Sequence, residues 1–264
     1  MAKPRFETLE DEWRAFMTGT HPLENRGRRT FGLIPAGPRC KVCSAPFGSP
    51  GRALFRRFGF EPWEKNPNIC RRCFTSLEGM QIAGAEVPSS FLFADMRRSS
   101  DLAREIGTME FTKLMQRFYD VAARIVIDND GILDKFVGDE VVGFFLPFMT
   151  GENHALAAIR TAEQLLFETG HRDPDGPWIP IGAGIHTGEP FVGVVTRNGV
   201  SEFTALGDPV NVAAHLAGQA GPGEILVTAE AAEAADLPRD GLEQRSLSLK
   251  GHPVEAVVLR LTGA

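Results

Sequence analysis

Apolar residues recur along the last two-thirds of the chain with two different spacings. Three- and four-residue spacing predicts helices at Asp101–Ile106, Met109–Ile127, His154–Thr169 and after Gly207. Short apolar runs bounded by turn residues predict strands at Ser90–Met96, Gly131–Val137, Glu140–Leu146, Ile179–His186, Phe191–Thr196, Ser201–Ala205, Glu224–Thr228, Leu242–Leu249 and Val254–Leu261. Because these elements mix without strict alternation, we expect an α+β fold with helices on one face of a sheet.

The helix predicted after Gly207 carries two polar residues outside its apolar face. Asp208 can cap this helix, and Pro209 suits its first turn. Asn211 and His215 lie one turn apart on another face, close to a helix N-terminus, which favours anions. This pair either faces a phosphate or lies on the solvated side of an ordinary helix.

The first third of the chain has a different pattern. Phe6–Met17 is predicted to be a short amphipathic helix, and the glycine- and proline-containing sequence up to Pro38 is predicted to be a loop. Aromatic residues supply a small core for the segment that follows; they are Phe55, Phe58, Phe60, Trp63 and Phe74. We therefore divide the chain into a helix and loop (1–38), a small module (39–74), a linker (75–87) and a larger domain (88–264).

The four cysteines of the chain all lie in the small module, as the pairs Cys40/Cys43 and Cys70/Cys73. In a cytosolic protein, two C-x-x-C pairs indicate a metal site rather than disulfides. Four thiolates form the tetrahedron that Zn²⁺ prefers, although an iron–sulfur cluster also accepts them. Excess Lys and Arg in the module either offset the thiolate charge, which we favour, or form a nucleic-acid patch. The site is expected to be a structural staple, with a redox or metal sensor as the alternative.

Overall composition narrows the classes of function. The formal charge of −6 argues against a general nucleic-acid binder. The longest apolar run, near Val141–Met149, is too short to span a bilayer, and Met1–Glu12 has no secretory leader. We expect a cytoplasmic protein without a membrane span.

Four charged residues of the larger domain are candidates for chemistry. Asp95 lies near the end of a strand, and Asp139 lies in the Gly138-Asp139 turn of a predicted hairpin. Mg²⁺ usually takes one or two protein carboxylates, although an aspartate in a turn is often only a turn former. Lys135 either protects a sheet edge or reads a ligand, and Lys250 either holds a phosphate or lies in water.

Three of these residues, Asp95, Lys135 and Asp139, lie within a set of four motifs that occur in one order. The motifs are FLFADMR at Phe91–Arg97, KFVGD at Lys135–Asp139, GIHTG at Gly184–Gly188 and ALGDPVNVAA at Ala205–Ala214. From about Val87 to Leu261, the chain resembles the class III nucleotidyl cyclase catalytic domain. The resemblance implies a ferredoxin-like α+β fold that works as a head-to-tail homodimer with shared active sites. It does not extend to the four-cysteine module.

The resemblance also implies roles for individual residues. Asp95 and Asp139, with the backbone carbonyl of Met96, match the positions that hold two Mg²⁺ or Mn²⁺ ions in each active site. Lys135 and Thr204 match the pair that reads the purine. Guanylyl cyclases typically have Glu at the lysine position, so Lys135 favours ATP.

Two further matches and one departure concern the ribose and the phosphates. Asn211 matches the asparagine that orients the ribose, and Lys250 matches the lysine that contacts the triphosphate. His215 departs from the family pattern, which has Arg at this position. Arg is a permanent forked cation, whereas His is shorter and largely neutral at pH 7.

The function expected from these matches is an adenylyl cyclase that converts ATP to 3′,5′-cyclic AMP and pyrophosphate. The metal module is a candidate regulator of this activity. Because of His215, the alternative is a cyclase-fold nucleotide-binding module with weak or no turnover. A guanylyl cyclase is the other alternative.

Overall fold

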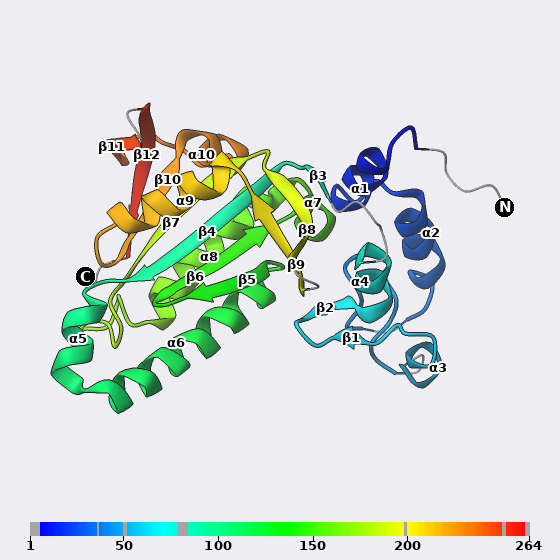
Figure 1. Ribbon diagram of the computed structural model, residues 1–264, viewed down its shortest axis with the longest axis horizontal. Coiled ribbons are helices and arrows are strands. Elements are labelled where there is room, and N and C mark those ends of the chain that lie inside the picture. Colours follow the sequence, from blue (N-terminus) through cyan, green and yellow to red (C-terminus); the bar gives the residue numbers. More distant parts are fainter. Residues whose placement is uncertain are drawn as a thin grey trace. The chain divides into compact units, whose positions relative to one another are not determined.

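The computed structural model describes residues 6–35, 37–49, 52–78, 84–197, 200–249 and 252–261 (Figure 1). The chain divides into two units. The first consists of Met1–Pro88, Leu146–Gly151 and Pro190–Leu206, and the second of Ser89–Phe145, Glu152–Glu189 and Gly207–Ala264. Two segments of the larger predicted domain therefore belong with the N-terminal part of the chain.

A seven-stranded sheet forms the centre of the second unit. Its order is β11-β12-β10-β7-β4-β6-β5, and within it only the β7–β10 pair is parallel among the described residues. The hairpin predicted at Gly138-Asp139 is confirmed, because Val137 pairs with Glu140. The strands are β4 (Ser89–Met96), β5 (Ile132–Val137), β6 (Glu140–Phe145), β7 (Ile181–Gly188), β10 (Glu224–Thr228), β11 (Glu243–Leu249) and β12 (His252–Arg260).

Helices cover both faces of this sheet. The helices are α5 (Ser99–Ile106), α6 (Thr108–Asp128), α8 (His154–Glu168), α9 (Asp208–Gln219) and α10 (Ala229–Ala234). Side chains of α6, α8 and α10 share one core with Ala183 and Ile185 of β7. Gly184 points to the other face, where a Cβ atom would lie 2.3 Å from the Ala217 nitrogen of α9. The prediction that helices occupy one face is therefore wrong, because glycine in β7 lets α9 pack closely on the second face.

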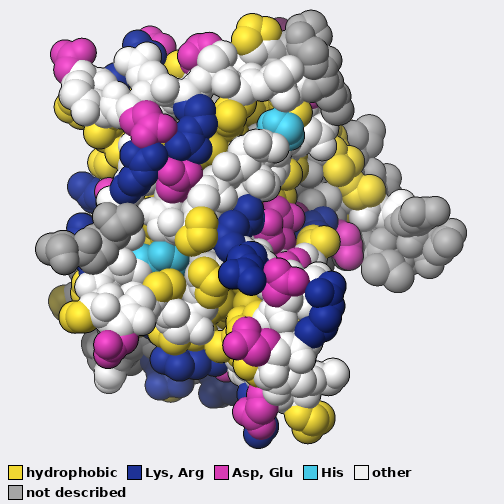
Figure 2. Space-filling view, turned by 90° about the vertical axis from the view of Figure 1, so that its left-hand side faces the viewer, with side chains coloured by type: hydrophobic (Ala, Val, Ile, Leu, Met, Phe, Trp, Pro, Cys, Tyr) yellow, Lys and Arg dark blue, Asp and Glu magenta, His cyan; other side chains and the backbone are white. Residues whose placement is uncertain are grey.

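Ion pairs join three neighbouring strands at one end of the sheet. Glu224 of β10 accepts hydrogen bonds from Arg245 of β11 and Arg260 of β12, at 2.9 to 3.2 Å. The hydrogen bonds from the Arg245 guanidinium are the main reason that the pKa of Glu224 is lowered to about 2. Figure 2 shows basic and acidic side chains next to one another on the side of the molecule that it presents.

In the first unit, a three-stranded antiparallel sheet has the order β3-β8-β9. Its strands are β3 (Gly84–Glu86), β8 (Phe191–Arg197) and β9 (Val200–Leu206). Helix α1 (Leu9–Met17) begins with a capping box formed by Thr8 and Asp11 and contributes the buried Trp13. Helix α7 (Pro147–Thr150) also belongs to this unit, and a short 3₁₀ helix (Gly151–Asn153) follows it in the sequence.

The region predicted to be a loop before Pro38 contains a helix, α2 (Pro22–Phe31). The prediction is wrong because Pro22 occupies the first turn, where proline is tolerated, and Nδ1 of His21 accepts a hydrogen bond from the Leu23 nitrogen. The remaining elements are α3 (Arg52–Arg56), β1 (Pro62–Trp63), β2 (Asn66–Cys70) and α4 (Arg71–Glu78).

The predicted aromatic core of the cysteine module forms only in part. The rings of Phe31, Phe55 and Phe60 contact one another edge to face, and Trp63 stacks on Phe74 at 3.7 Å. By contrast, Phe58 is 59% exposed, so its assignment to the core is wrong. In the part of the chain that the structure describes, none of the helices combines the length and hydropathy needed to cross a membrane.

Candidate functional site

Asp95 and Asp139 of the second unit line a single pocket of about 300 Å³, which Asp101 of α5 also lines. Asp95 lies at the end of β4, directly opposite Glu140 of β6. Asp139 lies in the turn between β5 and β6, and its carbonyl accepts a hydrogen bond from the Met96 nitrogen at 3.3 Å. The first turn of α5 completes the lining. Strand pairing thus brings together carboxylates that are more than 40 residues apart in the sequence.

Burial and neighbouring charges raise the pKa of two carboxyl groups, those of Asp95 and Glu140. Burial raises the pKa of Asp95, the Arg97 charge opposes this rise, and the Asp139 charge adds to it. Burial raises the pKa of Glu140 to about 7, and the charges of Asp95 and Asp139 contribute. A cluster of partly buried carboxylates in an accessible pocket fits a divalent cation that prefers oxygen ligands.

Arg97 also belongs to this site, and the sequence analysis gave it no role. Its guanidinium pairs with the Asp95 carboxylate and donates to the carbonyls of Gly218 and Ala220, at 3.2 and 3.3 Å. Residues two apart in an extended strand point to the same side, so the spacing of Asp95 and Arg97 held a signal for this pair. Arg97 thus neutralises Asp95 and joins the end of β4 to the end of α9.

Tyr119 of α6 contacts the turn that carries Asp139. The Tyr119 hydroxyl donates a hydrogen bond to the Gly138 carbonyl, and the Tyr119 ring packs against Phe136 with centroids 4.3 Å apart. Gly138 has a φ of +62°, which glycine adopts readily. Tyr119 had no signal in the sequence, because the contact depends on how α6 lies against the hairpin.

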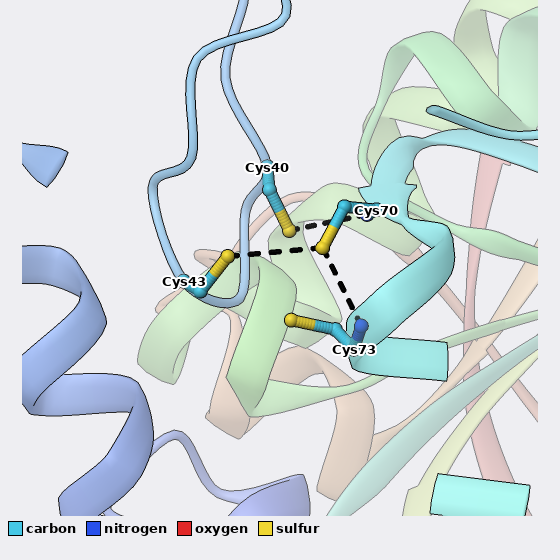
Figure 3. Close-up of side chains that lie close together, drawn as sticks. All are labelled: Cys40, Cys43, Cys70 and Cys73. Carbon is cyan, nitrogen blue, oxygen red and sulfur yellow. Dashed lines mark hydrogen bonds between the residues drawn. The ribbon is translucent and has the colours of Figure 1, made fainter. Parts of the chain in front are cut away.

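A second cluster lies in the first unit and consists of four buried cysteines (Figure 3). Their sulfur atoms all lie within 4.8 Å of one another, and Cys43 Sγ is 3.8 Å from Cys70 Sγ. The backbone nitrogen of Cys70 donates to Cys40 Sγ at 3.2 Å, and that of Cys73 donates to Cys70 Sγ at 3.4 Å. Hydrogen bonds from the other cysteines lower the pKa of Cys40. Four converging sulfurs with backbone donors fit a metal ion bound by thiolates.

Comparison with known proteins identifies the larger part of the chain. Residues 86–259 match the model of the adenylate and guanylate cyclase catalytic domain. The chain belongs to this family. The match includes all the residues that line the carboxylate pocket and excludes the cysteine cluster.

Relatives of this cyclase domain share moderate sequence identity with it. An uncharacterized protein of Mycobacterium tuberculosis is 30% identical over 186 residues, which are 66% of this chain and 32% of the relative. Adenylate cyclase 1 of Rhizobium meliloti is 30% identical over 132 residues, which are 48% of this chain and 20% of the relative. The chain thus spans about a third or less of the length of these relatives.

Solved structures show the same fold. The guanylyl cyclase Cya2 superposes with a TM-score of 0.60 at 22% identity, covering 69% of this chain and 95% of that structure. The adenylyl cyclase CyaB from P. aeruginosa superposes with a TM-score of 0.56 at 24% identity, covering 67% and 95%. The expectation of a class III cyclase fold is therefore confirmed.

Among the described residues, the others matched to this family do not line the carboxylate pocket. Lys135 is on β5, with Nζ 3.3 Å from an Asp134 carboxylate oxygen, and its side chain is 45% exposed. On α9, Asn211 is exposed and His215 is half-buried. Thr204 is buried in β9 of the first unit, and Lys250 lies outside the described residues. Among the described candidates, the pocket thus brings together only Asp95, Met96 and Asp139.

Helix α2 approaches the cysteine cluster closely. A Cβ atom on Gly27 would lie 3.0 Å from Cys43 Cβ, so a side chain at this position would collide. Arg28 Nε donates to the carbonyl of Val42, between the first two cysteines, at 3.0 Å. Glu24 is 2% exposed, its carboxylate has no hydrogen-bond partner among the described residues, and burial raises its pKa to about 8. These contacts make α2 part of the surroundings of the cysteine cluster.

Proposed function

We propose that the chain is an adenylyl cyclase that converts ATP to 3′,5′-cyclic AMP and pyrophosphate at the interface of a homodimer. The observation that carries this proposal is the shared pocket of Asp95 and Asp139 in a domain of the cyclase family. Lys135 supports ATP over GTP, because guanylyl cyclases of the family carry Glu at this position. The relative from Rhizobium meliloti, named an adenylate cyclase, supports the same choice.

The residues of the pocket have separate roles in the proposed reaction. Asp95 and Asp139 hold the cations, and the charge that Mg²⁺ or Mn²⁺ supplies favours ionisation of the ribose 3′-hydroxyl and offsets the triphosphate charge. The 3′-oxygen then bonds to the α-phosphorus, the bond from this phosphorus to the bridging oxygen breaks, and pyrophosphate leaves. The 3′-hydroxyl proton passes to solvent. Arg97 keeps Asp95 oriented before the cations bind.

The remaining residues bind the nucleotide. Lys135 and Thr204 read the adenine, Asn211 orients the ribose, and Lys250 and His215 face the phosphates. In the family that the chain resembles, each active site draws residues from both chains of a dimer, and Lys135 and Asp139 of one chain belong to opposite sites. The absence of Lys135, Asn211 and His215 from the lining of the carboxylate pocket agrees with this arrangement. This arrangement gives a homodimer with two equivalent sites.

The proposal is tested by incubating the purified chain with Mn²⁺ and either ATP or GTP. We expect cyclic AMP to form from ATP faster than cyclic GMP forms from GTP. The Asp95→Ala variant is the control, and cyclic nucleotide no higher than in this control would contradict an enzyme. A faster reaction with GTP would indicate a guanylyl cyclase instead.

Mixing two inactive variants tests the shared site. Lys135→Ala and Asp139→Ala chains are each expected to be inactive, whereas their mixture forms one intact site in each heterodimer. Recovery of a quarter of the wild-type activity is about the most that random pairing of equal amounts permits. No recovery would contradict sites built from two chains.

His215 favours a second candidate function, a nucleotide-binding module with little turnover. A neutral imidazole offers less stabilisation to the developing phosphoryl charge than a guanidinium. This function predicts tight binding of ATP without cyclic AMP above the Asp95→Ala control.

For the four cysteines, we propose one Zn²⁺ ion in a structural site. Four sulfurs about 2.3 Å from one ion at the corners of a tetrahedron lie about 3.8 Å apart. The distance from Cys43 Sγ to Cys70 Sγ has this value. In a four-iron cluster, each cysteine binds a different iron, which needs a wider spacing of the sulfurs. Metal analysis with an absorption spectrum tests this proposal, and visible bands of an iron–sulfur cluster would contradict it.

A further inference from the structure

Helix α1 makes a specific contact with the strand next to Thr204. Trp13 is fully buried, and its indole nitrogen donates to the Val192 carbonyl of β8 at 2.8 Å. Val192 pairs with Ala205 of β9, directly after Thr204. The contact joins residues 179 positions apart in the sequence. Figure 1 shows α1 next to β3 and β8 of the same unit.

The Trp13 ring also contacts β9 itself. Its centroid lies 6.4 Å from that of Phe203, the residue before Thr204. Successive side chains of a strand point to opposite faces, so Phe203 and Thr204 face opposite ways. Trp13 therefore supports β9 from the face opposite to Thr204.

The same helix is tied to the four-cysteine module. Four residues separate the end of α1 from the start of α2, and in this connection the buried His21 ring lies 5.8 Å from the Phe16 ring of α1. From α2, Arg28 donates to the Val42 carbonyl at 3.0 Å and to the Phe148 carbonyl of α7 at 3.3 Å. An unbroken series of contacts thus runs from the cysteine loop to β8 and β9 within the first unit.

We propose that Trp13 is a positioning residue for base recognition, which fixes the strand that carries Thr204 and connects this strand to the four-cysteine module. The proposal rests on the function proposed above, in which Thr204 reads the purine. Thr204 is 4% exposed, so the position of its hydroxyl is set by the position of β9. The strand pair that selects the base is therefore held by the N-terminal part of the chain as well as by the cyclase domain.

A matched pair of variants tests this role. Trp13→Phe keeps an aromatic ring and removes the N–H donor. Trp178→Phe makes the same change at an indole that donates to the Glu168 carbonyl at 2.9 Å, in the second unit. Equilibrium binding of ATP and GTP to the intact chain, measured by competition with a fluorescent ATP analogue, gives the selectivity without requiring turnover.

We expect Trp13→Phe to weaken ATP binding about three- to tenfold, with a smaller change for GTP, so that selectivity falls. Trp178→Phe should lower the melting temperature but leave both affinities unchanged. Equal selectivity in Trp13→Phe and the wild type would overturn the proposal, as would the same loss of selectivity in both variants. Normal binding without any cyclic AMP would contradict the proposed enzyme and leave this test intact.

Two additional measurements address a Trp13→Phe chain that does not fold. Phe203→Leu removes the ring contact and keeps the indole donor, and it should reduce selectivity by a smaller factor in the same direction. Replacing both Trp63 and Trp178 by Phe leaves Trp13 as the single tryptophan of three. Its emission should change when ATP binds and change less with GTP, whereas identical spectra would count against a role near the base.

Discussion

The two candidate metal sites of this chain differ in how much of each site one chain provides. The cysteine cluster is buried, and its four sulfurs converge within 4.8 Å. The carboxylate pocket has two candidate side-chain ligands, Asp95 and Asp139, and opens to a volume of about 300 Å³. A site with four protein ligands leaves no position for a substrate, whereas a site with two leaves most of the coordination sphere to substrate and water. The first arrangement suits folding and the second suits catalysis.

Burial raises the pKa of carboxyl groups at both sites. Glu24 beside the cysteines has its pKa raised to about 8, and Glu140 beside the aspartates has its pKa raised to about 7. The oxygens of Glu24 have no hydrogen-bond partner in the described structure, while Glu140 pairs with Asp95 across β4 and β6. Burial is the main cause of both shifts, and the charges of neighbouring thiolates or carboxylates add to it at each site.

Removal of metal should give the largest difference between the two sites, because only the cysteine module is expected to unfold. A chelator, or the Cys73→Ser variant, is expected to unfold the cysteine module, because its small core cannot replace binding energy on the order of 10 kcal/mol. The sheet of the second unit should remain folded. Hydrogen exchange measures both regions in one experiment, with faster exchange expected in β2 and α4 and little change in β4 and β7. Equal protection of β2 with and without metal would contradict a structural metal site.

At the carboxylate pocket, loss of a metal ligand is expected to reduce turnover without unfolding the domain. Asp139→Asn should lower turnover on the order of 10²- to 10³-fold, because a neutral amide holds a divalent cation weakly. Its melting temperature should stay the same or rise, since one of three neighbouring negative charges is removed. Asp128→Asn, at an exposed position of α6, is the matched control and should change neither quantity. Wild-type turnover in Asp139→Asn would show that the pocket does not bind the catalytic cation.

Local sequence patterns predicted the features that depend on near neighbours. The Gly138-Asp139 turn and the two C-x-x-C pairs are set by residues within one turn of one another, and the structure has both. Pro22 shows the limit of such patterns, because proline is typical both of loops and of a first helical turn. The second helical layer was missed because Gly184 gives no apolar signal, although its small size is what admits α9.

Partners that are distant in the sequence could not be predicted. Glu140 joins Asp95 only because β4 and β6 pair in one particular register, and a shift of one residue would turn it away. Tyr119 reaches Gly138 only through the placement of α6 against the hairpin. The roles of Lys135 and Thr204 stay predictions, since they depend on a second chain and a nucleotide.

A cation introduced at His215 should bring the carboxylate site closer to the usual family pattern. We expect His215→Arg to raise turnover on the order of tenfold, because a guanidinium stabilises the charge that develops on the transferred phosphoryl group. Gln219→Arg places the same charge one turn later on α9 and serves as the control. Steady-state kinetics with ATP measure the effect. Unchanged or slower turnover in His215→Arg would show that the lack of a permanent positive charge at this position is not what limits the reaction.

The smallest expected effect is a dependence of stability on pH at Glu140. Its pKa in the folded chain is raised from 4.5 to about 7, so the folded state binds the proton more tightly than the unfolded state. Stability contributed by the neutral form is therefore present below about pH 4.5 and is lost as pH rises through about 7. Glu140→Gln removes this loss.

Urea denaturation without divalent ions at pH 5 and pH 8 measures the difference. We expect Glu140→Gln to be more stable than the wild type by roughly 1–2 kcal/mol at pH 8, after allowance for solvent screening, and by much less at pH 5. Glu163→Gln, on the exposed side of α8, should change stability by less than about 0.5 kcal/mol at either pH. Added Mg²⁺ should narrow the gap at pH 8, since a bound cation stabilises the ionised cluster of the wild type. A gap that is the same at both pH values, and insensitive to Mg²⁺, would show that Glu140 does not share the charge of the pocket.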